Sequence, residues 1–161
     1  MVQKIAQAIV RQAKEECAQD IYFVPKDDCY ELYMRIGDER RFIQTYDFDQ
    51  LAAVISHFKF LAGMNVGEKR RSQLGSCDYR YDDKETSIRL STVGDYRGYE
   101  SLVIRLLHDE ETELKFWFTH FPELREKFKD RGLYLFSGPV GSGKTTLMHQ
   151  LAQLKFKGQQ V

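Results

Sequence analysis

The chain has 161 residues, of which 42% are hydrophobic and 30% are charged, and its 24 Lys and Arg residues balance 24 Asp and Glu residues. This length and composition predict one folded domain or two small ones. They exclude wholesale disorder and a protein built around a broad polyanion-binding surface, although a local basic site is compatible with zero net charge.

Neither a membrane span nor a cysteine-based site is indicated. No 18 apolar residues follow one another, so no membrane-spanning helix is predicted. The three cysteines, Cys17, Cys29 and Cys77, are far apart and form no Cys-x-x-Cys pair, which supports neither a zinc site nor a disulfide scaffold. We expect free, buried thiols in a reducing compartment.

The first half of the chain alternates between helix and strand patterns. Apolar residues recur at helical spacing from Val2 to Cys17, which predicts an amphipathic helix. Residues 21–24 and 32–36 are predicted strands, and residues 41–46 return as a hairpin partner. Asp47 with Gln50 predicts a capping-box start for a helix that ends near Gly63.

Short strands follow that second helix. Residues 64–76 are predicted to be irregular and locally basic, whereas alternation at 77–81 and 88–92 and an apolar run at 102–107 predict strands. Residues 1–108 therefore predict an α+β domain with two helices and five to six mostly antiparallel strands. The acidic run that begins at Asp109 predicts a linker over 109–121.

The last forty residues have a different pattern. A helix is predicted over 122–131, a continuous apolar strand of the parallel-sheet type over 133–136, and a second helix over 145–156. Between that strand and that helix, the sequence fits the Gly-x-x-x-x-Gly-Lys-Ser/Thr pattern, in which backbone amides and a helix N-terminus converge on phosphate. The nucleotide-binding residues expected here are Gly138, Pro139, Val140, Gly141, Ser142, Gly143, Lys144, Thr145 and Thr146.

The phosphate loop carries specific chemical expectations. Lys144 would reach the β and γ phosphates of ATP, and the Thr145 hydroxyl would ligate the accompanying Mg. A complete P-loop domain also needs several parallel strands and an acidic strand end, yet residues 145–161 contain no Asp or Glu. We therefore expect an N-terminal piece of a longer ATPase, with no hydrolysis by this piece alone.

Several ordered motifs ahead of the loop resemble those of the ATPases that power type II secretion and type IV pilus assembly. They lie at residues 20–22 (Asp-Ile-Tyr), 35–38 (Arg-Ile-Gly-Asp), 59–73, 89–92 (Arg-Leu-Ser-Thr) and 100–107. Each is a weak match alone, but their shared order before a P-loop is specific. The chain is most similar to the competence ATPases of Gram-positive bacteria within that family.

The resemblance implies a hexameric motor that binds ATP between the α+β domain and a RecA-like domain, which here begins within residues 122–161. The resemblance further implies that this motor powers assembly of a competence pilus or type II secretion pseudopilus for DNA uptake. It implies phosphate contacts from Arg89 and Arg105; the alternative for each is a strand arginine paired with a surface carboxylate. It also implies a polytopic membrane platform as partner, a cytoplasmic location at the inner face of the membrane, and no direct nucleic-acid binding.

Two other functions compete with the motor. In the first alternative, the chain is a non-catalytic docking domain for the membrane platform, and its P-loop does not take part in ATP turnover. A small-molecule kinase uses the same loop, but such kinases usually begin with it, whereas residues 1–137 precede it here. For the basic run at 69–71, a solvated loop and an inter-subunit contact are both open.

Overall fold

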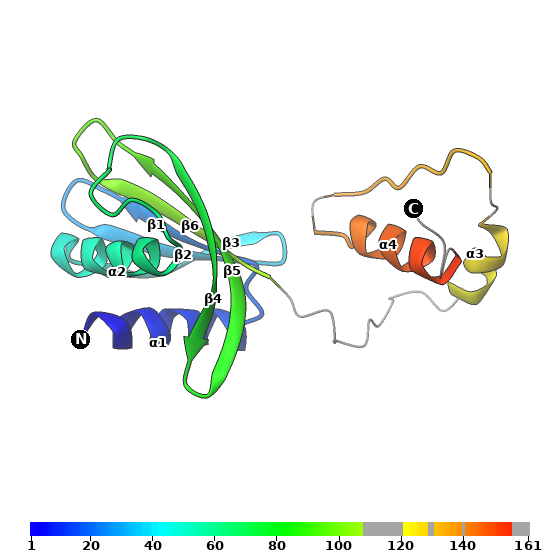
Figure 1. Ribbon diagram of the computed structural model, residues 1–161, viewed down its shortest axis with the longest axis horizontal. Coiled ribbons are helices and arrows are strands. Elements are labelled where there is room, and N and C mark those ends of the chain that lie inside the picture. Colours follow the sequence, from blue (N-terminus) through cyan, green and yellow to red (C-terminus); the bar gives the residue numbers. More distant parts are fainter. Residues whose placement is uncertain (108–120, 129–130, 140, 156–161) are drawn as a thin grey trace. The chain divides into compact units, whose positions relative to one another are not determined.

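Within the described residues, two helices and six strands form the first of two compact units, Met1–Thr112 (Figure 1). The computed structural model describes residues 1–107, 121–128, 131–139 and 141–155. This unit's elements are α1 (Val2–Glu15), β1 (Asp20–Pro25), β2 (Tyr30–Ile36), β3 (Glu39–Tyr46), α2 (Phe48–Leu61), β4 (Gln73–Tyr81), β5 (Lys84–Gly94) and β6 (Glu100–Leu106). The predicted pair of helices with antiparallel strands is confirmed.

The six strands form one sheet in the order β3-β2-β1-β6-β5-β4, with every neighbouring pair antiparallel. Two consecutive three-stranded runs, β1 to β3 and β4 to β6, therefore meet where β1 pairs with β6. In that pairing Asp20 lies opposite Arg105, and on its other side Asp20 lies opposite Arg35 of β2. Residues directly opposite in such a sheet share a face.

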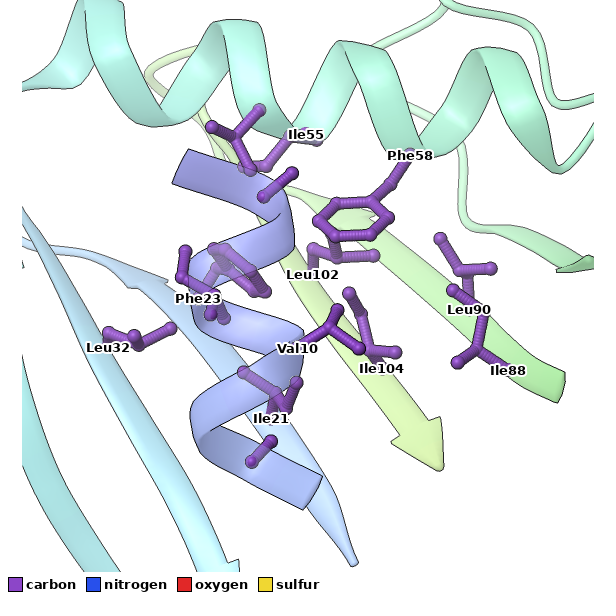
Figure 2. Packing of buried hydrophobic residues seen from close by; sticks show 14 of the residues in the cluster. Val10, Ile21, Phe23, Leu32, Ile55, Phe58, Ile88, Leu90, Leu102 and Ile104 are labelled. Atoms are coloured by element: carbon purple, nitrogen blue, oxygen red, sulfur yellow. The ribbon is translucent and has the colours of Figure 1, made fainter. Parts of the chain in front are cut away.

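One face of the sheet packs against both helices. Figure 2 shows Val10 of α1 and Phe58 of α2 above Ile104 and Leu102 of β6. Alternate strand residues supply the rest of this core, because successive side chains point to opposite faces. Among the fully buried members are Ala6, Ala13, Ile21, Phe23, Leu32, Met34, Leu51, Val54, Ile88, Leu102 and Ile104.

Both helices end in the same way. After α2, Gly63 adopts a φ of 66°, and the Met64 amide donates to the carbonyl of Lys59. After α1, Cys17 adopts a φ of 54°, and the Ala18 amide donates to the carbonyl of Ala13. Such left-handed residues reverse the chain and satisfy the last helical carbonyls.

Three details of the predicted helices are wrong. The first helix ends at Glu15 rather than Cys17, because Cys17 has already left the helical conformation. The same turn places Cys17 at the surface, and Cys29 and Cys77 are only partly buried, so none of the three free cysteines is fully buried as expected. Asp47 is the N-cap of α2, but its side chain makes no capping hydrogen bond, so the capping box with Gln50 does not form.

The segment between α2 and β4 is more ordered than predicted. β4 begins at Gln73, within the stretch expected to be irregular. Before it, the Asn65 side chain accepts the amides of Gly67 and Glu68, and the Glu68 carboxylate accepts those of Arg70 and Arg71. These two amides hold the pKa of Glu68 below its usual range. The turn is therefore held by its own polar side chains.

The second unit, Glu113–Val161, contains α3 (Phe121–Lys127) and α4 (Lys144–Lys155) in its described part. The helix predicted over 122–131 ends at Lys127, and the one predicted over 145–156 is α4. Residues 133–136 form no strand, since no described segment pairs with them, and a lone strand leaves its backbone groups unpaired. The linker expected over 109–121 lies outside the described residues except for Phe121, which begins α3, and the loop residue Val140 also lies outside them. None of the described helices is long and apolar enough to cross a membrane.

Candidate functional site

The glycine-rich segment folds back on itself directly before α4. Gly141 and Gly143 both adopt a φ of 81°, which glycine reaches without strain. The Ser142 amide donates to the carbonyl of Pro139 at 3.3 Å, which closes the turn. α4 then begins at Lys144, so the first amides of the helix follow the loop immediately. Such amides lack intrahelical partners and attract anions.

The side chains around this turn have the composition that phosphate binding requires. The Lys144 ammonium folds back over the loop and donates to the carbonyl of Pro139 at 2.5 Å. Gly138 and Pro139 form the exposed start of the loop, and Thr145 and Thr146 are exposed in the first turn of α4. The arrangement places one cation and two hydroxyls beside a helix N-terminus, where a phosphate with its Mg would be received.

A row of arginines crosses the sheet in the first unit. The register places Arg89 of β5 opposite Arg105 of β6, Arg105 opposite Asp20 of β1, Asp20 opposite Arg35 of β2, and Arg35 opposite Arg40 of β3. We call these four arginines with Asp20 the arginine row. Its members lie on the sheet face opposite α1 and α2, because the residues that alternate with them belong to the core.

Asp20 is the only carboxylate of the arginine row and is only 2% exposed. Its Oδ1 accepts the Arg105 Nε–H at 2.8 Å, and its Oδ2 lies 3.4 Å from Arg105 Nη2 and 3.5 Å from Arg35 Nη1. The hydroxyl of Tyr22 also donates to Oδ2, at 3.3 Å. The hydrogen bond to Asp20 raises the pKa of Arg105. The row therefore carries a net positive charge, with its negative charge sequestered at the centre.

The remaining arginines of the row differ in how they are held. The Arg40 guanidinium lies over two rings, 4.7 Å from the centroid of Tyr22 and 4.4 Å from that of Tyr33. Arg89 is exposed, and no hydrogen bond or ion pair holds its side chain within the described part of the chain. Directly opposite like charges repel, so Arg89 and Arg105 favour an anion between or above them.

These observations bear on the two arginines predicted from the sequence. Arg105 is paired with a carboxylate, as the alternative interpretation expected, but that carboxylate is buried and leaves the Arg105 side chain 62% exposed. Arg89 shows no such pairing among the described residues. The structure brings Arg89 and Arg105 together, and their contact with phosphate stays a prediction.

Sequence reasoning missed Arg40 and the central place of Asp20. Asp20 and Arg40 each lie one residue before a predicted strand, at 21–24 and 41–46. Asp20 reaches Arg105 only through the pairing of β1 with β6, which no local pattern reveals. The basic run at 69–71 occupies the exposed turn described above. Only Arg71 of this run makes an ion pair within the described residues, a 4.0 Å contact with Glu68, and Arg71 is 88% exposed.

Comparison with known proteins identifies the family. The sequence profile of the family described as "Type II/IV secretion system protein" matches residues 1–160. The chain belongs to this family. Among its relatives, the "Competence protein ComGA" of Streptococcus pneumoniae is 71% identical over the whole chain, and that of Bacillus subtilis is 29% identical over 94% of it. The chain spans 51% and 44% of these relatives, about half their length.

Other relatives include ATPases. The "Type IV pilus assembly ATPase PilB" of Thermus thermophilus is 34% identical over 89% of this chain, which covers 17% of that protein. Among solved structures, the Legionella pneumophila ATPase DotB superposes with a TM-score of 0.61, at 13% identity, over 90% of this chain and 40% of its own. The similarity to DotB establishes a shared fold.

Proposed function

We propose that this chain is part of a motor subunit that binds and hydrolyses ATP to drive assembly of a competence pilus, or type II secretion pseudopilus, for DNA uptake. The observation that carries the proposal is the glycine-rich turn at residues 138–145, which leads directly into α4 in a chain of the secretion family. The names of the relatives, competence protein and pilus assembly ATPase, support the same assignment.

In this proposal the loop of the second unit holds the triphosphate at the start of a RecA-like domain. Backbone amides from Gly141 to Thr146 donate to phosphate oxygens, and Lys144 exchanges its contact with the Pro139 carbonyl for the β and γ phosphates. The Thr145 hydroxyl holds Mg, which offsets the charge of the phosphates. The contribution of the chain is positioning and charge, since phosphoryl transfer demands little covalent chemistry from a protein.

Arg89 and Arg105 are proposed to stabilise the charge that develops on the phosphoryl group during transfer. Both guanidiniums are exposed, adjacent and permanently charged, and Asp20 compensates only part of their charge. A guanidinium fork suits phosphate oxygens because it donates two parallel hydrogen bonds. An arginine in such a role contributes about 10³-fold or more to turnover.

The assembly follows from the same assignment. We propose a hexamer that is located at the cytoplasmic face of the membrane on a polytopic platform protein. No direct contact with nucleic acid is proposed. The basis is membership of the secretion family and the relatives named above.

A docking role without catalysis is the second candidate. It is favoured by the segment at 133–136, where Leu133 and Leu135 are 95% and 89% exposed and no described strand pairs with them. Under this proposal the exposed apolar segment contributes to the surface that attaches the protein to its platform, and the loop does not turn over ATP within this chain alone.

A chimera separates the two proposals. In it, this chain replaces the matching region of the Streptococcus pneumoniae ComGA, which supplies the remaining half of the protein. We expect the chimera to hydrolyse ATP and Lys144→Ala to lower turnover by about 100-fold or more, because the positive charge that contacts the β and γ phosphates is lost. Lys127→Ala, at an exposed lysine of α3, is the control. Unchanged turnover in Lys144→Ala would refute the P-loop assignment.

The arginines are tested in the same chimera. Arg105→Ala and Arg89→Ala should each lower kcat by about 10³-fold or more while the protein stays folded. Arg80→Ala is the matched control, because Arg80 is 85% exposed on β4 and pairs with Glu85 at 2.7 Å outside the row. If kcat and nucleotide affinity remain at the level of the control, neither arginine contacts phosphate.

A further inference from the structure

Asp20 occupies a position that strand chemistry disfavours. Aspartate is depleted in strands, and a buried charge is costly unless it is paired and hydrogen-bonded. Yet Asp20 lies in the central strand β1, only 2% exposed, on the face that the helices do not cover. The other buried carboxylate of the described residues, Glu100, pairs with the fully buried Lys59. Asp20 instead pairs with arginines that reach the surface.

The two arginines that Asp20 contacts are held to different extents. All three nitrogens of the Arg35 guanidinium are engaged, with Nε donating to the Gly37 carbonyl, Nη2 to the Gln19 side chain and Nη1 facing Asp20. Arg35 is accordingly only 22% exposed. Arg105 uses Nε and Nη2 on Asp20 and remains 62% exposed. All guanidinium nitrogens of Arg35 are therefore engaged within the fold, whereas Arg105 is hydrogen-bonded along one edge of its guanidinium and is exposed along the other.

The hydrogen bonds to Asp20 matter because Arg105 lies next to another cation. Its cross-strand neighbour on the other side is Arg89, a second cation for which the described residues provide no partner. Without a carboxylate at Asp20, repulsion from Arg89 and the freedom of a long side chain would both move the Arg105 guanidinium away from one defined position. With it, one edge is anchored and the Nη1 group stays available to an anion.

We propose that Asp20 is a positioning residue: it holds the Arg105 guanidinium in one orientation, ready to receive a phosphoryl group, without touching that group itself. This inference rests on the proposed function, in which Arg105 contacts phosphate. Because Asp20 already orders the Arg105 side chain, no further conformational entropy is lost at the moment of transfer. Asp20 therefore contributes to the rate through Arg105.

The first test needs no substitution. In the 161-residue chain, NMR exchange spectroscopy of the arginine side chains compares the Nε–H signals of Arg105 and Arg89 for their exchange with water. A hydrogen bond to a buried carboxylate predicts that the Arg105 signal exchanges at least 10-fold more slowly than that of Arg89. Equal rates for the two signals would overturn the proposal, whatever the fate of any variant.

The second test uses the chimera. Asp20→Asn retains the size of the side chain and removes its charge, and we expect kcat to fall by about 10- to 100-fold with KM for ATP changed less than twofold. Asp82→Asn is the matched control, because Asp82 pairs with Arg11 through two 2.8 Å hydrogen bonds far from the row. A kcat equal to that of the control refutes positioning by Asp20.

The outcomes distinguish this inference from the proposed function. If Arg105→Ala abolishes turnover while Asp20→Asn does not, phosphate contact stands and positioning by Asp20 fails. If Arg105→Ala itself leaves turnover unchanged, the proposed role of Arg105 fails first. A loss of kcat in both variants, with slow Nε–H exchange in the unsubstituted chain, supports the inference.

Discussion

The buried pair of Lys59 and Glu100 predicts a large effect on stability. Lys59 is fully buried in α2, and its ammonium lies 2.6 Å from Glu100 Oε1 and 2.7 Å from the carbonyl oxygen of Glu68. Lys59→Met keeps an unbranched side chain, one atom shorter, but Glu100, a residue 5% exposed, loses the cation beside its carboxylate.

The expected loss of stability in Lys59→Met comes from the unpaired carboxylate of Glu100 that stays buried. Removing one partner of a buried ion pair lowers the free energy of unfolding by about 3–5 kcal/mol, because an uncompensated charge stays inside. That cost reduces the folding equilibrium constant by about 10²- to 10⁴-fold, against a total stability of about 5–15 kcal/mol for ordinary domains. The double variant Lys59→Met with Glu100→Gln should recover part of the loss, since both charges are then removed.

Urea denaturation of the 161-residue chain measures this effect, with amide NMR signals of β1 and β6 reporting on the first unit. Lys26→Met is the control: Lys26 is 48% exposed, pairs with Glu31 at 3.3 Å, and should cost less than about 1 kcal/mol. If Lys59→Met is as stable as Lys26→Met, loss of the cation beside Glu100 does not destabilise the fold, and the reasoning from burial is wrong.

Three further outcomes are expected, each measured on the same chain. Phe58→Ala should lower the free energy of unfolding by about 3–5 kcal/mol, because the ring is fully buried, whereas Phe60→Ala, at a ring 74% exposed, should change it by less than about 0.5 kcal/mol in urea denaturation. In Gly94→Ala, the new Cβ would lie 1.9 Å from the backbone oxygen of Lys69, so the turn before β4 must shift. Changes in amide chemical shift that are confined to β5 would contradict this. Burial raises the pKa of both Tyr30 and Tyr79 to about 12, against about 10 when unfolded, so the free energy of unfolding should fall as pH rises from about 10 to 12, and Tyr30→Phe should make that fall less steep.

Local patterns were sufficient to predict most of the elements in the first unit. Helical spacing identified α1 and α2, alternation identified the strands, and Gly63 correctly marked the end of α2. The glycine-rich motif similarly located α4 to within one residue. These features depend on residues that are near one another in the sequence.

Features that depend on distant residues could not be predicted. Asp20 and Arg105 are 85 positions apart, so the arginine row emerged only with the strand order. A buried Lys59 requires Glu100, 41 positions away, and nothing in α2 indicates that partner. The expected strand at 133–136 failed for a related reason: its pattern specifies burial between neighbours, and no described segment supplies them.

The pairing of β1 with β6 also determines when the first unit is able to fold. Each hairpin of this unit joins strands that follow one another, but the central pairing waits until Leu106 has been synthesised and has left the ribosome. Closing so long a loop is slow relative to forming a hairpin. Until then, α1, α2 and β1 to β3 lack the buried residues that β6 adds to their common core, and during synthesis this incomplete unit is the stage at which chaperones or aggregation compete with folding.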